Sequence, residues 1–214
     1  MIVNIIIINS SLTSLICAHH ILDNLPKAKI HLLTEEAEVG LLNEAPGLLN
    51  SRIDELIPEG WIHNLRNQQP SEDSTAVRRS WLERGIASKL AERGATIHLR
   101  TTHQRESKEY EKFIHLTGAG AQSGSSIKVN HYLKLEQNGN QQIWKGGVHN
   151  GGLSGSEFEG CRPDGTIEIW WKNGEDEPHI DGSWLQLTEW KGPDPQRALE
   201  IEFHDGIDLA ASIL

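Results

Sequence analysis

Hydrophobic and polar positions at the start of the chain predict a strand, a helix and a second strand. Residues 2–8 are an apolar run rich in isoleucine, and residues 29–33 form a second short apolar run. Between them, apolar side chains recur at the spacing of one helix face, and the pattern stops at Pro26. Such a unit predicts a right-handed crossover between two parallel strands.

The turn after the first strand stands where a nucleotide-binding unit of this kind carries glycines. A dinucleotide turn has the pattern G-x-G-x-x-G, whose glycines permit a tight turn, close approach of the pyrophosphate and close packing of the helix. Asn9, Ser11 and Ser14 occupy the three glycine positions. Asparagine adopts left-handed conformations readily, and a serine at position 14 costs little. Ser11 is the serious replacement, because its side chain fills the space that a pyrophosphate needs.

The same turn keeps features that favour anions. The first N–H groups of the following helix have no partners within the helix, and the hydroxyls of Ser10, Ser11 and Thr13 add further donors. Three outcomes therefore stay open: a dinucleotide bound in a displaced position, a different nucleotide, or none.

An acidic residue follows the second predicted strand. Glu35 comes 26 residues after Asn9, where a carboxylate would accept hydrogen bonds from the hydroxyls of an adenosine ribose. Glu36 and Glu38 stand beside it, so a solvated acidic loop is the alternative interpretation.

The middle of the chain predicts further helices and strands. A short helix is expected near residues 51–56, and an apolar stripe from Val77 to Leu90 predicts a longer helix that ends at Gly94. Strands are expected at 95–101 and 112–116. Arg79 falls in the longer helix, beside Arg78, and an ordinary solvated helix face is the alternative to a functional role.

The composition changes after residue 117. Fifteen of the 20 glycines and five of the seven tryptophans lie beyond it. Alternating runs at 128–135, 167–172 and 184–190, separated by turn sequences, predict an antiparallel meander. The five tryptophans could line an aromatic substrate pocket or pack within the sheet. Residues 198–203 are expected to form a strand, followed by a turn and the beginning of a helix.

The order of these segments resembles the FAD-binding fold of flavin-dependent monooxygenases, halogenases and related reductases. The resemblance rests on residues 9–35 with Ala18 and Gly40, on 43–47, which is similar to a halogenase G-E-A-x-x segment, and on 79–99 and 117–124. It implies a set of cofactor-binding residues: Asn9, Ser11 and Ser14 at the phosphates, Glu35 at the ribose, and Arg79 and Gly118 near the cofactor. Residues 204–211 look like a shortened form of the segment that faces the flavin ring.

The expected fold is α/β, with a Rossmann-like parallel sheet of the FAD/NAD(P)-binding type and an antiparallel β-sheet portion in the C-terminal half. Residues 1–124 with 198–214 would form the FAD-binding-type domain, and residues 125–197 a substrate-like domain. The expected function is that of a small flavoprotein oxidoreductase, monooxygenase-like or reductase-like, with FAD and a small-molecule substrate. The alternative is a non-catalytic relative that has lost the cofactor and binds a ligand or a protein. Catalytic residues are not assigned.

Charge and cysteine content narrow the class of partner. The formal net charge is −10, and residues 118–214 hold 15 acidic against 7 basic side chains, so a nucleic-acid or membrane partner is not expected. The excess acid is interpreted as a solvated face. Cys17 and Cys161 form no disulfide framework, which favours a reducing cytoplasm, and Cys17 is expected in the core. The 11 histidines show no metal-ligand spacing. The sequence indicates no oligomeric state.

Overall fold

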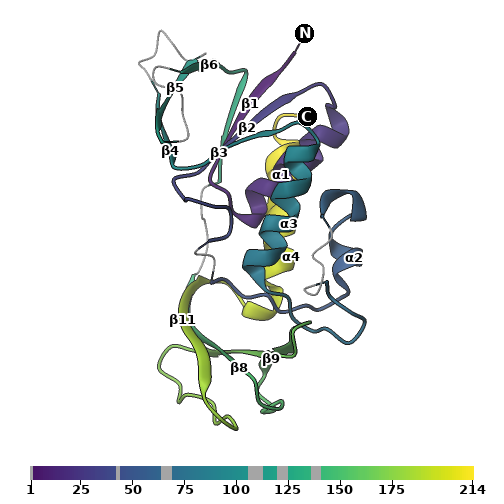
Figure 1. The fold of residues 1–214 in the computed structure, drawn as a ribbon, viewed down its shortest axis with the longest axis vertical. Coiled ribbons are helices and arrows are strands. Elements are labelled where there is room, and N and C mark those ends of the chain that lie inside the picture. The colour runs from purple at the N-terminus through teal and green to yellow at the C-terminus, as the bar shows by residue number, and fades with distance from the viewer. Residues whose placement is uncertain (1, 42–43, 64–68, 106–112, 120–124, 136–140) are drawn as a thin grey trace. The chain divides into compact units, whose positions relative to one another are not determined.

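The computed structural model describes residues 2–41, 44–63, 69–105, 113–119, 125–135 and 141–214. The chain divides into two compact units (Figure 1). The first unit comprises Met1–Leu41, Ile86–Glu136 and Phe203–Leu214, and the second comprises Leu42–Gly85 and Gln137–Glu202. Each unit is described by itself.

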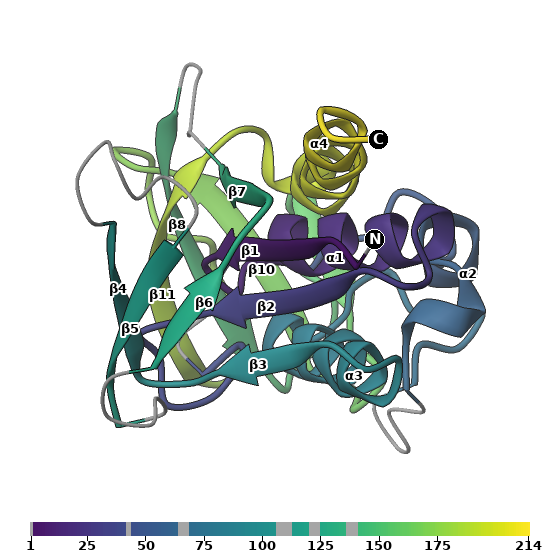
Figure 2. The ribbon, with the colours of Figure 1, turned by 90° about the horizontal axis from the view of Figure 1, so that it is seen from above.

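A four-stranded parallel sheet forms the centre of the first unit. Its strands are β1 (Asn4–Ile8), β2 (Lys29–Leu33), β3 (Thr96–His98) and β7 (His131–Lys134), in the order β3-β2-β1-β7. Because every neighbouring pair is parallel, the carboxyl ends of the strands meet at one edge, where open α/β sheets bind ligands. Figure 2 shows the sheet from above.

Helix α1 (Leu12–Asn24) follows β1 and packs on one face of this sheet (Figure 2). Ten of its side chains are buried, which is more than a single helix face provides. Helix α4 (Ala198–Ala211) explains the second buried face, since a Cβ on Gly206 would lie 2.7 Å from the carbonyl oxygen of Thr13. Cys17 is fully buried as predicted, and burial raises the pKa of its thiol to about 12.

The opposite face of the parallel sheet is covered by a three-stranded antiparallel sheet, which also connects β3 to β7. Its strands are β4 (Thr101–Arg105), β5 (Phe113–Gly118) and β6 (Ser126–Lys128). A cluster that includes Ile6, Leu33, Ile114 and Leu116 joins the two sheets. The central residues of β1 are therefore buried on both faces, which is why residues 5–8 are continuously apolar rather than alternating.

The second unit contains an antiparallel sheet in the order β11-β8-β10-β9. Its strands are β8 (Gln142–His149), β9 (Phe158–Cys161), β10 (Ile167–Lys172) and β11 (Trp184–Gly192). Trp144, Trp170 and Trp171 are at most 6% exposed and lie in core clusters, which confirms the packing interpretation for these three tryptophans. The unit also holds α2 (Ile53–Leu56), the short 3-10 helices Glu59–Trp61 and Pro195–Arg197, and the start of α3 (Arg79–Glu92).

The predicted fold class is confirmed: the structure is α/β, with a parallel sheet and antiparallel sheets. Three local predictions are wrong. The run at 128–135 was expected in the antiparallel meander, but β7 pairs in parallel with β1. A strand of four residues carries too little pattern to select its partner, and the partner is chosen by tertiary packing. The segment expected as one strand at 95–101 forms β3 and β4, which are separated at Arg100 by a φ of 48°.

The segment 198–203 is the third wrong prediction, because it forms the start of α4 instead of a strand. Its apolar and acidic residues alternate, which suggested a strand. Asp194 accepts a hydrogen bond from the N–H of Gln196 at 2.8 Å, and Pro195 follows as the first residue of the 3-10 helix that leads into α4. This capping signal outweighs the alternation, since no strand of the described residues offers the segment a ladder.

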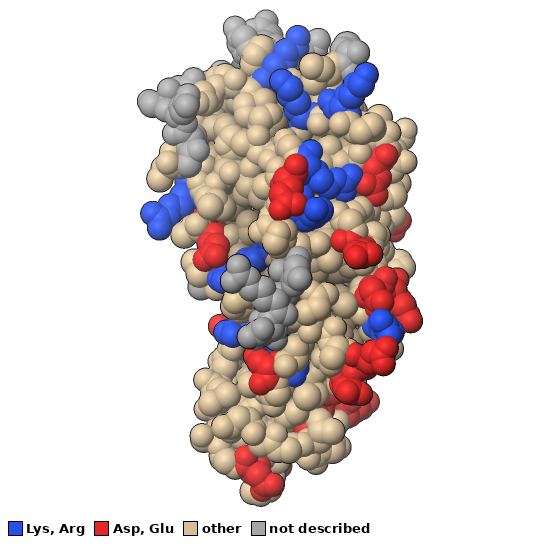
Figure 3. Space-filling view, turned by 45° about the vertical axis from the view of Figure 1, so that its right-hand side comes forward, with Lys and Arg blue, Asp and Glu red and all other residues tan. Residues whose placement is uncertain are grey.

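No helix among the described residues is long and apolar enough to cross a membrane. On the face drawn in Figure 3, basic side chains stand near acidic ones in several places, and no continuous basic stripe runs across the part of that face that is described.

The buried histidine of α1 provides a test of the core of the first unit. His19 is fully buried, its Nε2–H donates to the carbonyl of Ile86 (3.0 Å), and its Nδ1 accepts from Arg93 (2.9 Å). The arginine can only donate, so the ring is held neutral. Burial is the main reason why the pKa of His19 falls to about 4, while the Ile86 hydrogen bond opposes this shift.

Replacing His19 by Gln should reduce the loss of stability at acid pH. The folded-state pKa is lower than the unfolded one, so the unfolded state binds the extra proton and stability falls as the pH drops from about 6.5 to about 4. We expect H19Q to lose about 2 kcal/mol less than the unmodified protein between pH 7 and pH 4.5. Urea unfolding at both pH values measures this, with H20Q as the matched control. An unchanged pH dependence in H19Q contradicts the assignment.

Candidate functional site

The turn between β1 and α1 lies at the carboxyl edge of the parallel sheet. Asn9 has a φ of 82°, so the expectation that asparagine adopts the left-handed conformation of the first glycine position is confirmed. Its side-chain Oδ1 accepts hydrogen bonds from the backbone N–H groups of Ser10 (2.6 Å) and Ser11 (3.1 Å). Asn9 therefore contributes to the turn twice: its backbone adopts the left-handed conformation, and its side chain accepts two backbone hydrogen bonds.

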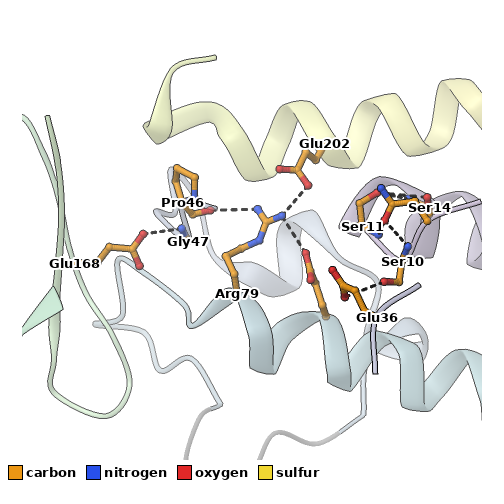
Figure 4. A network of polar contacts seen from close by, with 11 residues as sticks. Ser10, Ser11, Ser14, Glu36, Pro46, Gly47, Arg79, Glu168 and Glu202 are labelled. Atoms are coloured by element: carbon orange, nitrogen blue, oxygen red, sulfur yellow. Dashed lines mark hydrogen bonds and ion pairs between the residues drawn. The ribbon is translucent and has the colours of Figure 1, made fainter. Parts of the chain in front are cut away.

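Ser11 is the N-cap of α1. Its backbone is extended, with φ −60° and ψ 162°, and its Oγ accepts from the N–H of Ser14 at 3.5 Å (Figure 4). Ser14 is fully buried, and its own hydroxyl donates to the carbonyl of Ile8 at 3.4 Å. The structure thus brings Asn9, Ser11 and Ser14 together in one hydrogen-bonded turn.

An acid from the end of β2 reaches this turn, and it is Glu36. The hydroxyl of Ser10 lies 3.4 Å from Glu36 Oε2 (Figure 4). It also lies 3.1 Å from Thr34 Oγ1. The backbone N–H of Glu36 also donates to Thr34 Oγ1 at 3.2 Å. Glu35 follows β2 as predicted, but its side chain is exposed. The sequence shows acids at both positions, and only the conformation of the loop decides which of them faces Ser10.

The charge of Glu35 instead influences the pKa of His103, a histidine of the three-stranded sheet. His103 Nε2 lies 2.9 Å from the hydroxyl of Tyr132, with the two ring centroids 5.5 Å apart. The pKa of His103 is lowered, mainly by burial and further by Lys134, whereas the charge of Glu35 works in the opposite direction. The His103–Tyr132 contact joins β4 of the three-stranded sheet to β7 of the parallel sheet.

Arg79 belongs to the second unit and is paired within it. Its side chain is 2% exposed and donates to the carbonyl of Pro46 (3.1 Å), to Glu83 (3.2 Å) and to Glu202 (2.7 Å) (Figure 4). Burial opposes its charge, but Glu202 and Glu83 outweigh burial and raise the pKa of Arg79. The arginine is therefore not the ordinary solvated helix residue that the sequence left open, and two carboxylates already compensate its charge.

The segment that resembles the halogenase motif is held by a second buried acid. Glu168 is 1% exposed and accepts from the N–H of Gly47 (2.8 Å), from the indole of Trp170 (2.7 Å) and from Arg162 (2.6 and 2.9 Å). A Cβ on Gly47 would lie 1.8 Å from the carbonyl oxygen of Val77, so only glycine fits there. Residues 42–43 of this region lie outside the described residues.

Gly118 ends β5 in the three-stranded sheet. It has a φ of 115°, and a Cβ would lie 2.1 Å from the carbonyl oxygen of Arg100. The structure therefore gives this glycine a backbone role at the β4–β5 pair. The rest of its glycine-rich segment, residues 120–124, lies outside the described residues. Among the residues that are described, no group of three or more His, Cys, Asp or Glu side chains is arranged to hold a metal ion.

Comparison by sequence and by structure gives different results. No protein-family model matches the chain, and no curated protein matches it by sequence. Solved structures match its fold. The chain is similar to p-nitrophenol 4-monooxygenase PnpA from Pseudomonas putida DLL-E4, with 9% identity and a TM-score of 0.64, over 99% of this chain and 79% of that one.

Two further matches are a hydroxylase and a halogenase. Aklavinone-11 hydroxylase, solved with FAD and aklavinone, has 12% identity and a TM-score of 0.59, over 99% of this chain and 62% of that one. The halogenase PltM has 10% identity and a TM-score of 0.61, over 98% and 68%. The chain spans only 61% to 64% of the length of four of the matched structures.

These matches define the class of fold. The chain has the fold of flavoprotein monooxygenases and halogenases, with a parallel nucleotide-type sheet and antiparallel sheets. At such low identity the likeness shows the fold alone, so the activity has to be argued from the site.

Removing the buried arginine should strongly destabilise the protein. Arg79→Ala removes the guanidinium that pairs with the buried Glu83, and breaking a buried pair in this way costs about 3 to 5 kcal/mol. Arg78 is exposed on the same helix boundary, so R78A is the matched control and should change the free energy of unfolding by less than about 0.5 kcal/mol. Urea unfolding measures both. Equal effects of the two substitutions would show that the buried cluster contributes little.

Proposed function

We propose that this chain is a flavoprotein of the oxidoreductase type that holds FAD at the carboxyl edge of its parallel sheet. The observation that carries the proposal is the placement of the Glu36 carboxylate against the turn between β1 and α1. An acid at the end of the second strand and a helix N-terminus after the first strand are the two parts that bind the ribose and the phosphates of a dinucleotide. The fold of the matched flavoproteins supports the same assignment.

The residues of the turn fit the two parts of the cofactor unequally. Glu36 offers carboxylate oxygens to ribose hydroxyls, and its partner Ser10 is a hydroxyl that can reorient. In the first turn of α1, the N–H groups of Leu12 and Thr13 have no acceptor within the helix, as at any helix N-terminus. The N–H of Ser14 is capped by Ser11. The ribose half thus fits as the structure stands, and the pyrophosphate has to approach past the side chain of Ser11.

The flavin, when bound, would supply the redox chemistry, and the chain would hold it and exclude water. We propose a small molecule as the substrate, in line with the aklavinone complex of one structural match. The net charge of −10 supports the absence of a nucleic-acid or anionic-membrane partner, and the two free cysteines support a cytoplasmic location.

Adding FAD to the purified protein tests the proposal directly. With FAD in excess, we expect the visible spectrum of a bound flavin and a raised melting temperature, because a ligand that binds the native state stabilises it. If the protein shows neither a flavin spectrum nor a thermal shift, the proposal is wrong. The alternative, a non-catalytic relative that has lost the cofactor, is then favoured.

Two adjacent acids provide a sharper version of this test. Glu36→Gln should weaken the binding of FAD and of adenosine at least about tenfold, because hydrogen bonds to a charged group contribute roughly 1.5 to 3 kcal/mol. Glu35→Gln is the matched control, and its exposed side chain should leave both affinities unchanged. Isothermal titration calorimetry measures both. A loss confined to E35Q would instead restore the ribose role predicted for Glu35 from the sequence.

A further inference from the structure

We infer that the turn between β1 and α1 is closed by its own side chains, so that a dinucleotide has to displace Asn9 and Ser11 in order to bind. This inference rests on the proposed function, and it specifies which ligands the site takes most readily. Two of the glycine replacements, Asn9 and Ser11, do more than fill space, since each supplies an oxygen that accepts backbone hydrogen bonds.

Asn9 accepts hydrogen bonds from the first two N–H donors of the turn, those of Ser10 and Ser11. With Asn9 in the left-handed conformation, the N–H groups of Ser10 and Ser11 converge on one point, at 2.6 Å and 3.1 Å from Asn9 Oδ1. Successive N–H groups that converge after a left-handed residue form a concave nest that binds anions. Here the amide oxygen of the asparagine occupies that nest. A glycine at position 9 would keep the conformation and leave the nest open.

Ser11 accepts the hydrogen bond of a third donor, the N–H of Ser14 at the start of α1. Its Oγ accepts from the N–H of Ser14 at 3.5 Å and lies 3.3 Å from the hydroxyl of the same residue. Three backbone N–H groups, those of Ser10, Ser11 and Ser14, are thereby satisfied by two side-chain oxygens that glycines do not have. These three N–H groups therefore need no ligand as an acceptor.

The closure acts on one part of a nucleotide only. Glu36 lies at the end of β2, and its contact to Ser10 Oγ is long, at 3.4 Å, so the carboxylate stays available for ribose hydroxyls. Adenosine, which carries no phosphate, binds without opening the turn, whereas ADP and FAD must break the Asn9 and Ser11 hydrogen bonds. The site therefore takes FAD as an exchangeable ligand, and not as a group that stays bound through purification.

Opening the turn by substitution tests this. In the double variant Asn9→Gly with Ser11→Gly, titration calorimetry should show affinities for FAD and ADP raised at least about tenfold, and the affinity for adenosine unchanged within about twofold. S11A, which removes the hydroxyl but keeps the Cβ, should give a smaller gain for the same two ligands. Asn9 is exposed and Ser11 is half-buried, so these variants should fold. D194G removes a cap of the same type in the second unit, and it should change none of the three affinities.

Hydrogen exchange of the free protein provides a readout that does not depend on FAD. Measured by NMR, the amides of Ser10 and Ser11 should exchange at least about tenfold faster in N9G, and the amide of Ser14 at least about tenfold faster in S11A. Unprotected amides at these three positions in the unmodified protein would overturn the inference, whatever the protein binds.

The outcomes separate the two proposals. Binding of FAD that is already tight and unchanged in the double variant overturns the closure and leaves the proposed function standing. Protected amides with no binding of FAD, ADP or adenosine by any variant support the closure and overturn the proposed function.

Discussion

The structure of the first unit depends on how the backbone N–H groups between β1 and α1 are satisfied. A strand that ends at the edge of a parallel sheet and passes at once into a helix leaves several donors without partners. In a glycine turn these donors are available to a phosphate. In this chain the oxygens of Asn9 and Ser11 accept three of the hydrogen bonds, and Ser14 ties the first turn of the helix back to Ile8. The turn is thus formed without relying on a ligand.

The second unit contains charged side chains that are buried and paired. Arg79 and Glu168 are almost fully buried, and charged groups at such positions are expensive unless every hydrogen bond is matched. Glu168 accepts from a backbone amide, an indole and a guanidinium. Arg79 donates to a carbonyl and to two carboxylates, while its buried Nε–H has no acceptor among the described residues. These contacts fix the segment around Pro46 and Gly47 against its own unit. The sequence resemblance gave Arg79 a cofactor-binding role, but in the structure the charge of Arg79 is already compensated by Glu83 and Glu202.

The fold matches that of solved flavoprotein monooxygenases and halogenases over nearly the whole of this chain. The parallel sheet, the three-stranded sheet that leads to β7 and the antiparallel sheet follow the architecture of the matched structures. The chain covers between 61% and 79% of the length of eight of those structures. The segment that resembles the closing part of the family is only α4, which begins six residues after β11 ends.

The sequence by itself determined the local elements and the kind of turn. The apolar run of β1, the spacing of α1 and the bounds of β2 follow from pattern, and the left-handed conformation of Asn9 follows from its chemistry, because all of these depend on neighbours along the chain. Only the tertiary structure decided that β7 pairs with β1, that Arg79 is buried against Glu202 and that Glu36 faces Ser10. Each of these depends on a partner far away in the sequence, and neither periodicity nor residue type specifies which distant group will be in contact.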